Sequence, residues 1–208
     1  FDHKIQMVSQ HRYAYYSLGS NQEEAGMPSP FVDHPDRVRY PVGDFGLDPE
    51  VTASKRARWL QQMAEVPAGL AAALSGLDDR QLGTPYREGG WTPRQLVHHL
   101  ADAHMNGFVR FKLALTEDLP PIKTYEETLW AETADGRDAP VGVSVRLLAA
   151  LHERWTILLA SLSGPEFGRA FSHPQRGLMT IDKAIQLYAW HGIHHTSHIT
   201  GLRDRQGW

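Results

Sequence analysis

Apolar residues recur at helical spacing in four long stretches of the chain. The stretches run from about residue 49 to 74, from 93 to 116, from 143 to 162 and from 181 to 205. Within each stretch the apolar positions fall three or four residues apart, so they share one helical face. Little of the remaining sequence alternates as a strand does. The pattern predicts an all-α protein whose core is a four-helix bundle.

Two of these helices carry clear start signals. Thr92 can cap the helix that follows it, Pro93 suits the first helical position, and Gln95 completes a capping box. For the last helix, Thr180 is a candidate N-cap and Gly207 stands just beyond the expected end. Both helices are therefore expected to begin directly after their threonine.

The first helix contains two prolines with different expected effects. Pro49 lies in the segment Asp48-Pro49-Glu50, and proline suits a first turn, so the helix is expected to begin there. Pro67 lies in the interior, where the missing N–H and the steric clash of the ring should kink or split the helix.

The segments between the helices complete the predicted organisation. Residues 117–142 form a link that contains prolines and is long enough to cross over the bundle. Residues 171–178 indicate a short β-hairpin around a Pro/Gly turn, before the last helix. Residues 1–39 are polar and weakly periodic, which predicts an N-terminal extension that lies on the surface or is partly disordered. The bundle domain is then expected over residues 40–208.

Histidine is unusually frequent in this sequence, at 12 of 208 residues. Seven of the histidines lie in two clusters, which are His98, His99 and His104, and then His191, His194, His195 and His198.

Three of these histidines occupy positions that the helical period assigns to the core. His191 and His195 are four residues apart and share one face of the last helix, a spacing that suits metal chelation. His99 interrupts the core face of the 93–116 helix in the same way. Three converging imidazoles satisfy one another poorly in a core without a cation. We therefore predict a divalent metal on these three, with an open position where bound water could ionise near neutral pH.

The neighbouring polar residues have less defined expected roles. Asp102 follows His99 by three residues and His98 by four, so its carboxylate can orient one imidazole or lie exposed on a solvated face. Tyr188 and Trp190 can line a pocket or simply pack. The remaining histidines of the two clusters are expected at the surface or in support of the ligands, and these are His98, His104, His194 and His198.

Composition excludes several classes of function. The net charge of −3 argues against nucleic acid as a partner, because phosphate binding needs a basic surplus. No apolar run approaches the ~20 residues that a membrane-spanning helix needs. Since the chain has no cysteine, it has no disulfide, no thiolate ligand and no cysteine nucleophile. No export signal is visible, so a cytoplasmic location is the simplest expectation.

Several motifs resemble the DinB-like superfamily and, within it, the metal-dependent hydrolases of the YfiT type. The matching segments are residues 40–43, 84–92, 97–106, 110–112, 171–180 and 188–200, which include His98-His99-Leu100-Ala101-Asp102 and Tyr188-Ala189-Trp190-His191. The resemblance covers about residues 40–208. It implies a four-helix bundle, often a homodimer, and one zinc or nickel ion on His99, His191 and His195.

The resemblance leaves the reaction open. One possibility is hydrolysis of a small-molecule substrate by activated water. Another is S-transfer, because some members are similar to enzymes that join bacillithiol, a low-molecular-weight thiol, to electrophiles. A third is a non-catalytic metal-binding stress protein, in which a fourth ligand such as His194 or Asp102 closes the site. A plain interaction domain with solvent-facing histidines is the fourth alternative.

Overall fold

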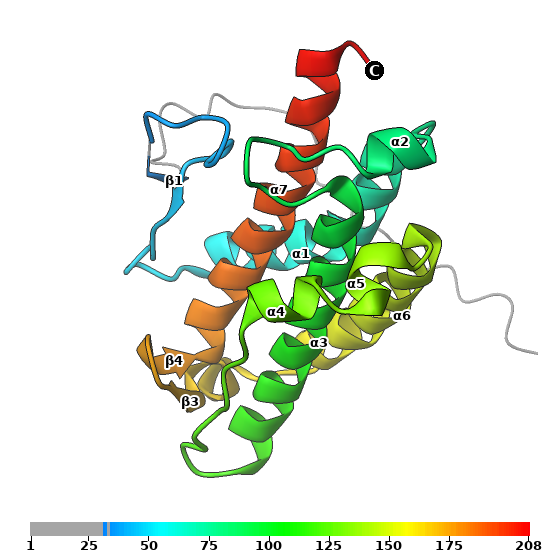
Figure 1. Cartoon of the computed structure of the whole chain (residues 1–208). Coiled ribbons are helices and arrows are strands. Elements are labelled where there is room, and N and C mark those ends of the chain that lie inside the picture. Colours follow the sequence, from blue (N-terminus) through cyan, green and yellow to red (C-terminus); the bar gives the residue numbers. More distant parts are fainter. Residues whose placement is uncertain (1–30, 33) are drawn as a thin grey trace, which may run out of the picture.

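The computed structural model describes residues 31–32 and 34–208. Within them, four long helices pack together: α1 (Ala53–Leu74), α3 (Pro93–Thr116), α6 (Val141–Ala160) and α7 (Ile181–Gln206) (Figure 1). The predicted all-α bundle is therefore confirmed. No helix in the described part of the chain is both long and apolar enough to cross a membrane.

Short elements fill the connections between the long helices. They are β1 (Phe31–Val32), β2 (Asp44–Phe45), α2 (Asp79–Leu82), α4 (Glu127–Ala131), α5 (Ala134–Asp138), the 3₁₀ helix η1 (Gly164–Gly168), β3 (Ala170–His173) and β4 (Gly177–Thr180). Strands β3 and β4 pair antiparallel, with Ala170 opposite Thr180, so the predicted hairpin is present. The sequence pattern missed the short helices, since four or five residues are too few to show a helical period.

The ends of α3 and α7 follow the predicted caps. The Thr92 side chain accepts a hydrogen bond from the Gln95 backbone, and the Gln95 side chain accepts one from the Thr92 backbone. Thr180 caps α7 through the Lys183 backbone N–H, and Gly207 ends that helix in the left-handed conformation, with φ of 70°. This conformation favours glycine, which explains the stop.

Helix α1 begins later than expected, and it is not split at Pro67. It begins at Ala53 and not near Pro49, because Thr52 caps it by accepting a hydrogen bond from the Lys55 backbone N–H. The Asp48 carboxylate instead accepts from the Glu50 backbone in a turn before the helix. Pro67 does not split the helix, which is continuous from Ala53 to Leu74.

The link between α3 and α6 crosses over the bundle, as predicted. Its residues return along α3, since Arg94 and Gln95 at the start of α3 donate hydrogen bonds to the carbonyls of Ala139 and Ala131. Helix α6 therefore starts beside the start of α3, and the two helices run parallel. Helix α7 runs antiparallel to α3, since Phe111 packs near Tyr188 while His99 contacts His191 further along α7.

The buried apolar residues form two separate groups along the bundle. One group surrounds Trp155 and Phe111, and the other surrounds Leu100 and Leu148. On α6, His152 lies between the two groups. On α7, the four histidines between Ala189 of the first group and Ile199 of the second lie there as well. A layer of imidazoles thus separates two apolar cores.

The described end of the predicted extension is attached to the bundle domain. Strand β1 pairs antiparallel with β2, and the carbonyl of Arg39 accepts a hydrogen bond from the His198 ring on α7. The expectation of a surface or partly disordered extension otherwise concerns residues 1–30 and 33, which lie outside the described residues.

The close approach of α3 to α7 yields a prediction about Gly107. A Cβ at this position would press into the Tyr188 ring and lie 2.7 Å from Cη2 of Trp155. Since overpacking costs about 1–3 kcal/mol, Gly107→Ala should lower the free energy of unfolding by that amount in urea denaturation.

The matched control is Gly69→Ala on the exposed side of α1, where a Cβ meets no atom within 4 Å. That change should stabilise the protein by up to about 1 kcal/mol, because alanine is the better helix former. Equal effects of the two substitutions would contradict the close packing described at Gly107.

Candidate metal centre

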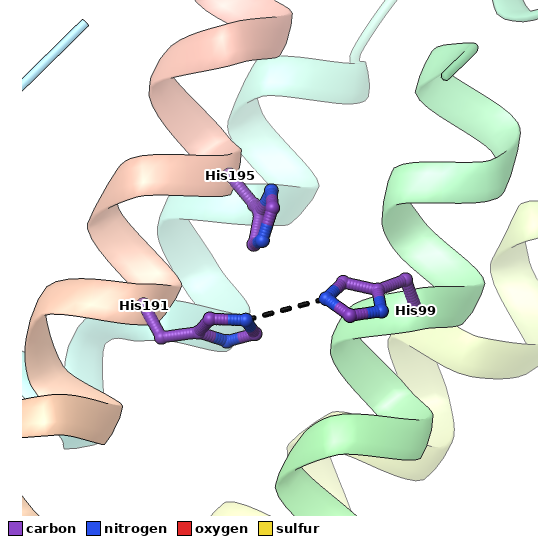
Figure 2. Close-up of side chains that lie close together, drawn as sticks. All are labelled: His99, His191 and His195. Carbon is purple, nitrogen blue, oxygen red and sulfur yellow. Dashed lines mark hydrogen bonds between the residues drawn. The ribbon is translucent and has the colours of Figure 1, made fainter. Parts of the chain in front are cut away.

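The three histidines predicted as ligands meet between α3 and α7. His99 projects from α3, and His191 and His195 project from successive turns of α7 (Figure 2). One ring nitrogen from each lies within 4.8 Å of the others. The Nε2 atoms of His99 and His191 are 3.2 Å apart. Periodicity placed these residues on core faces, and the antiparallel packing of the two helices brings them together.

The donor set and its spacing fit a transition-metal ion. Zinc binds imidazole nitrogen at ~2.0–2.1 Å, so two ligands of a tetrahedral ion are separated by roughly 3.3 Å. The 3.2 Å between the Nε2 atoms of His99 and His191 is close to that value. Two bare nitrogen lone pairs at this distance repel each other, and a hydrogen or a cation between them removes the repulsion. An all-imidazole set suits zinc or nickel better than calcium or magnesium, which prefer oxygen.

The rings are held in the neutral form that binds metals. Burial lowers the pKa of His99 to about 4. The pKa values of His191 and His195 lie well below the usual range, first because of burial and then because neighbouring imidazoles disfavour a second positive charge. At neutral pH these three nitrogens therefore need lose no net proton to accept a cation.

A cavity of about 180 Å³ opens beside His99 and His191. Tyr188 and Trp190 line this cavity, which agrees with the expectation that these aromatic residues line a pocket. The cavity also receives charged side chains, which are Arg110, Arg176, Glu126 and Glu127. The Arg110 guanidinium donates to the Tyr188 hydroxyl and to the Lys123 carbonyl, so its position at the cavity is fixed. Small molecules can reach the histidines from this side.

The other clustered histidines are not at the surface, and that part of the expectation was wrong. Each exposes less than a tenth of its area: His98 6%, His104 0%, His194 7% and His198 3%. The physical reason is tertiary packing, which the period of one helix does not reveal. Helix α6 covers His98 and His104, and the segment before β2 covers His194 and His198. His98 is held by the Ser144 hydroxyl and the Ala139 carbonyl.

Sequence reasoning missed one histidine in this layer, His152 on α6. It is 2% exposed, and its Nε2 lies 2.8 Å from Nδ1 of His104. The available signal was a histidine in the apolar stripe of the 143–162 stretch, between Leu148 and Trp155. His173 on β3 is also buried and lines the cavity.

Asp102 makes no hydrogen bond to an imidazole within the described residues. Both ring nitrogens of His98 are engaged elsewhere, so Asp102 does not orient that ring. Burial, and secondly the nearby Asp135 carboxylate, raise the pKa of Asp102 to about 6. A role for Asp102 toward His99 stays a prediction.

A second group of histidines is close enough to be considered for metal binding. It consists of His194, His195 and His198, whose candidate ligand atoms also lie within 4.8 Å of one another. Nδ1 of His194 is buried without a hydrogen-bond partner. The two groups share His195.

Comparison with known proteins shows the family to which this chain belongs. The model of the DinB superfamily matches residues 62–199, and the chain belongs to this superfamily. A protein of Bacillus mycoides (strain KBAB4) named putative metal-dependent hydrolase is 49% identical over 171 residues, covering 82% of this chain and 98% of the relative. A protein of Bacillus cereus (strain 03BB102) with the same name matches to the same extent.

A solved structure shares the bundle topology. YfiT from Bacillus subtilis, described as a probable metal-dependent hydrolase with an unusual four-helix bundle topology, superposes with a TM-score of 0.81. It is 46% identical and covers 83% of this chain and 99% of its own. The resemblance read from the sequence is thereby confirmed.

The buried histidines predict how the metal-free protein responds to acid. Burial lowers the pKa of His98 below its usual 6.5 and that of His152 to about 4. The unfolded chain therefore binds more protons than the folded chain between about pH 6.5 and pH 4, and stability must fall as the pH falls through that window. Asp102, with a raised pKa of about 6, acts in the opposite direction but is one group against several.

Urea unfolding of the metal-free protein should show a lower free energy at about pH 5 than at about pH 7. His152→Gln should reduce this dependence by up to roughly 1.4 kcal/mol per pH unit, because one titrating group is lost. A stability that is constant or higher at the lower pH would contradict the neutral, buried state of these rings.

Proposed function

We propose that this protein is a metal-dependent hydrolase of small molecules, with zinc or nickel held by His99, His191 and His195. The observation that carries the proposal is the meeting of three neutral imidazoles, two of which, His99 and His191, line a cavity. An ion held there supplies Lewis acidity, which polarises a substrate carbonyl or lowers the pKa of water. The names of the relatives agree with this reaction class.

The side chains around the cavity supply binding and orientation. Arg110 and Arg176 can hold an anionic or strongly polar part of a substrate, and Glu126 and Glu127 can accept hydrogen bonds from its donors. The Trp91 ring packs against His99 with centroids 4.7 Å apart and the ring planes tilted by 51°, and limits the approach of solvent from that side. Substrates of this cavity are thus small and polar.

Thiol S-transfer is the second candidate for the same site. The chain has no cysteine, so a thiol nucleophile must come from a separate small molecule such as a bacillithiol-like thiol. Arg110 and Arg176 suit the carboxylates that such a thiol can carry. A closed, non-catalytic site is less well supported, because within the described residues no fourth histidine or carboxylate completes the His99 group.

Activity should depend on metal and distinguish the two reactions. We expect metal-free protein reloaded with zinc or nickel to hydrolyse some members of a panel of small esters and amides without added thiol. His99→Ala should lose this activity, and His98→Ala, on the same helix but bonded to Ser144, should keep most of it. Turnover that appears only when a thiol and an electrophile are added would support S-transfer instead.

Metal binding should also stabilise the fold. Because a ligand bound only by the folded state raises stability by mass action, zinc or nickel should raise the Tm of the metal-free wild type. His191→Ala should keep its helical circular dichroism, since most of the core is apolar, but lose the shift in Tm. An undiminished shift would assign the metal to other residues, first among them the His194, His195 and His198 group.

A further inference from the structure

A chain of three hydrogen bonds leads from His191 across the bundle to the backbone of α1. Nδ1 of His191 lies 3.2 Å from Nε2 of His104, and Nδ1 of His104 lies 2.8 Å from Nε2 of His152. Nδ1 of His152 lies 2.7 Å from the carbonyl oxygen of Met63. The chain therefore runs through α7, α3 and α6 and ends on α1.

The carbonyl of Met63 is available because of Pro67. In an α-helix the carbonyl of residue 63 would accept from the N–H of residue 67, four positions later. Proline has no N–H, so the oxygen lacks that partner and accepts from His152 instead. The proline that was expected to kink or split α1 thus leaves the Met63 carbonyl as the acceptor at the end of this hydrogen-bond chain.

A carbonyl oxygen only accepts hydrogen bonds, and this fixes the direction of every bond in the chain. His152 must carry a hydrogen on Nδ1 to donate to the Met63 carbonyl. Because burial keeps the ring neutral, it has no second hydrogen, and its Nε2 is an acceptor. His104 must then donate from Nδ1 and accept at Nε2. His191 in turn donates from Nδ1, and its Nε2 is left as a bare lone pair that faces Nε2 of His99.

A second chain of the same kind ends on His195. Nε2 of His198 lies 2.9 Å from the carbonyl oxygen of Arg39, so His198 donates there and its Nδ1 is an acceptor. Nδ1 of His195 lies 3.4 Å from that Nδ1 and is the donor. His195 is therefore left with a bare Nε2 as well.

We infer that His104 with His152, and His198, are positioning residues that fix the ligand tautomers of His191 and His195 before any metal binds. The two backbone carbonyls of Met63 and Arg39 set the direction of the chains, and in both ligands Nε2 is the nitrogen left for the cation. The inference rests on the proposed three-histidine site. A hydrogen bond to the far nitrogen of a ligating imidazole also fixes its orientation and raises its basicity.

His99 differs from its two partners. Within the described residues its Nδ1 has no hydrogen bond, so no chain fixes its tautomer. In the metal-free protein His99 carries its hydrogen on Nε2 and donates it to Nε2 of His191 over 3.2 Å. When a cation takes that place, only His99 has to move its hydrogen to the other nitrogen.

The second histidine group serves, on this assignment, to support the first. If Nδ1 of His195 donates to His198, the same nitrogen cannot also be a ligand to a metal held by His194 and His198. One ion per chain is expected, not two. A second tightly bound ion that is lost in His198→Phe but not in His99→Ala would overturn this part of the inference.

The tautomers can be measured directly on the metal-free wild type. Long-range proton–nitrogen correlation spectra distinguish a ring protonated at Nδ1 from one protonated at Nε2. Histidine in solution favours Nε2–H, so Nδ1–H signals from His104, His152, His191 and His195 are a distinctive expectation. On loading with zinc, His191 and His195 should keep their tautomer and His99 should switch. An Nε2–H tautomer at His191 in the metal-free protein would overturn the inference, whether or not the protein binds metal.

Variants of His104 separate positioning from packing. His104→Gln keeps an acceptor oxygen near the position of Nε2, whereas His104→Phe keeps the volume and removes the acceptor. Zinc affinity, measured by competition with a chromogenic chelator, should fall about 10- to 100-fold in His104→Phe and be largely retained in His104→Gln. The matched control is His98→Phe, a buried histidine of the same helix bonded to Ser144, which should lose stability but keep its zinc affinity.

The variants distinguish a positioning role of these rings from a packing role. Equal losses in His104→Phe, His104→Gln and His98→Phe would mean that these rings only fill the core, and the inference would be wrong. If His104→Phe does not fold, His152→Phe tests the first chain one bond further from its ligand. His198→Phe tests the second chain, in which His198 contacts the ligand His195 directly. A wild type with the expected tautomers but no zinc affinity would keep the tautomer assignment and refute the proposed metal site.

Discussion

The structure depends on one constraint, which is that a layer of imidazoles lies between two apolar cores and every ring nitrogen there needs a partner. A buried polar group without a hydrogen bond costs about 1–3 kcal/mol, so each complementary pair in such a layer stabilises the fold, while Nδ1 of His194 is buried without a partner. The rings of His98, His104, His152 and His198 meet this requirement through backbone carbonyls, a hydroxyl and one another. His99, His191 and His195 are left facing a common point.

The topology of the bundle places that point at the cavity. The crossover link makes α6 parallel to α3, so that His152 comes level with His104. The antiparallel packing of α7 against α3 brings His191 level with both His99 and His104. At this level α1 supplies a carbonyl that Pro67 has released from the helix. Each of the four long helices therefore contributes to the same layer, and the layer in turn fixes their register.

The sequence predicted the parts of this arrangement that depend on local chemistry. Capping by Thr92 and Thr180 located two helix starts, and the helical period placed His99, His191 and His195 on core faces. It could not show that His104, His152 and His198 are buried, because burial depends on how neighbouring helices are aligned. Pro67 was expected only to kink or split α1, because the sequence does not show that His152 lies opposite the carbonyl that the proline releases.

The hydrogen-bond chains that end on His191 and His195 also explain why so many histidines are present. Three would suffice to hold an ion, yet the described structure adds rings that accept hydrogen bonds from two of the three. In this account the additional imidazoles reduce the reorganisation needed when the ion binds, because two ligands already present the correct nitrogen. The cavity beside them then brings small polar molecules to the same point.

The most direct test of the central claim is the metal content of the protein after exhaustive dialysis, measured by elemental analysis. The wild type and the His98→Ala control should each retain about one zinc or nickel ion per chain, and His99→Ala should retain none. Absence of metal from the wild type after reloading, or equal metal in His99→Ala, would contradict a cation site shared by α3 and α7.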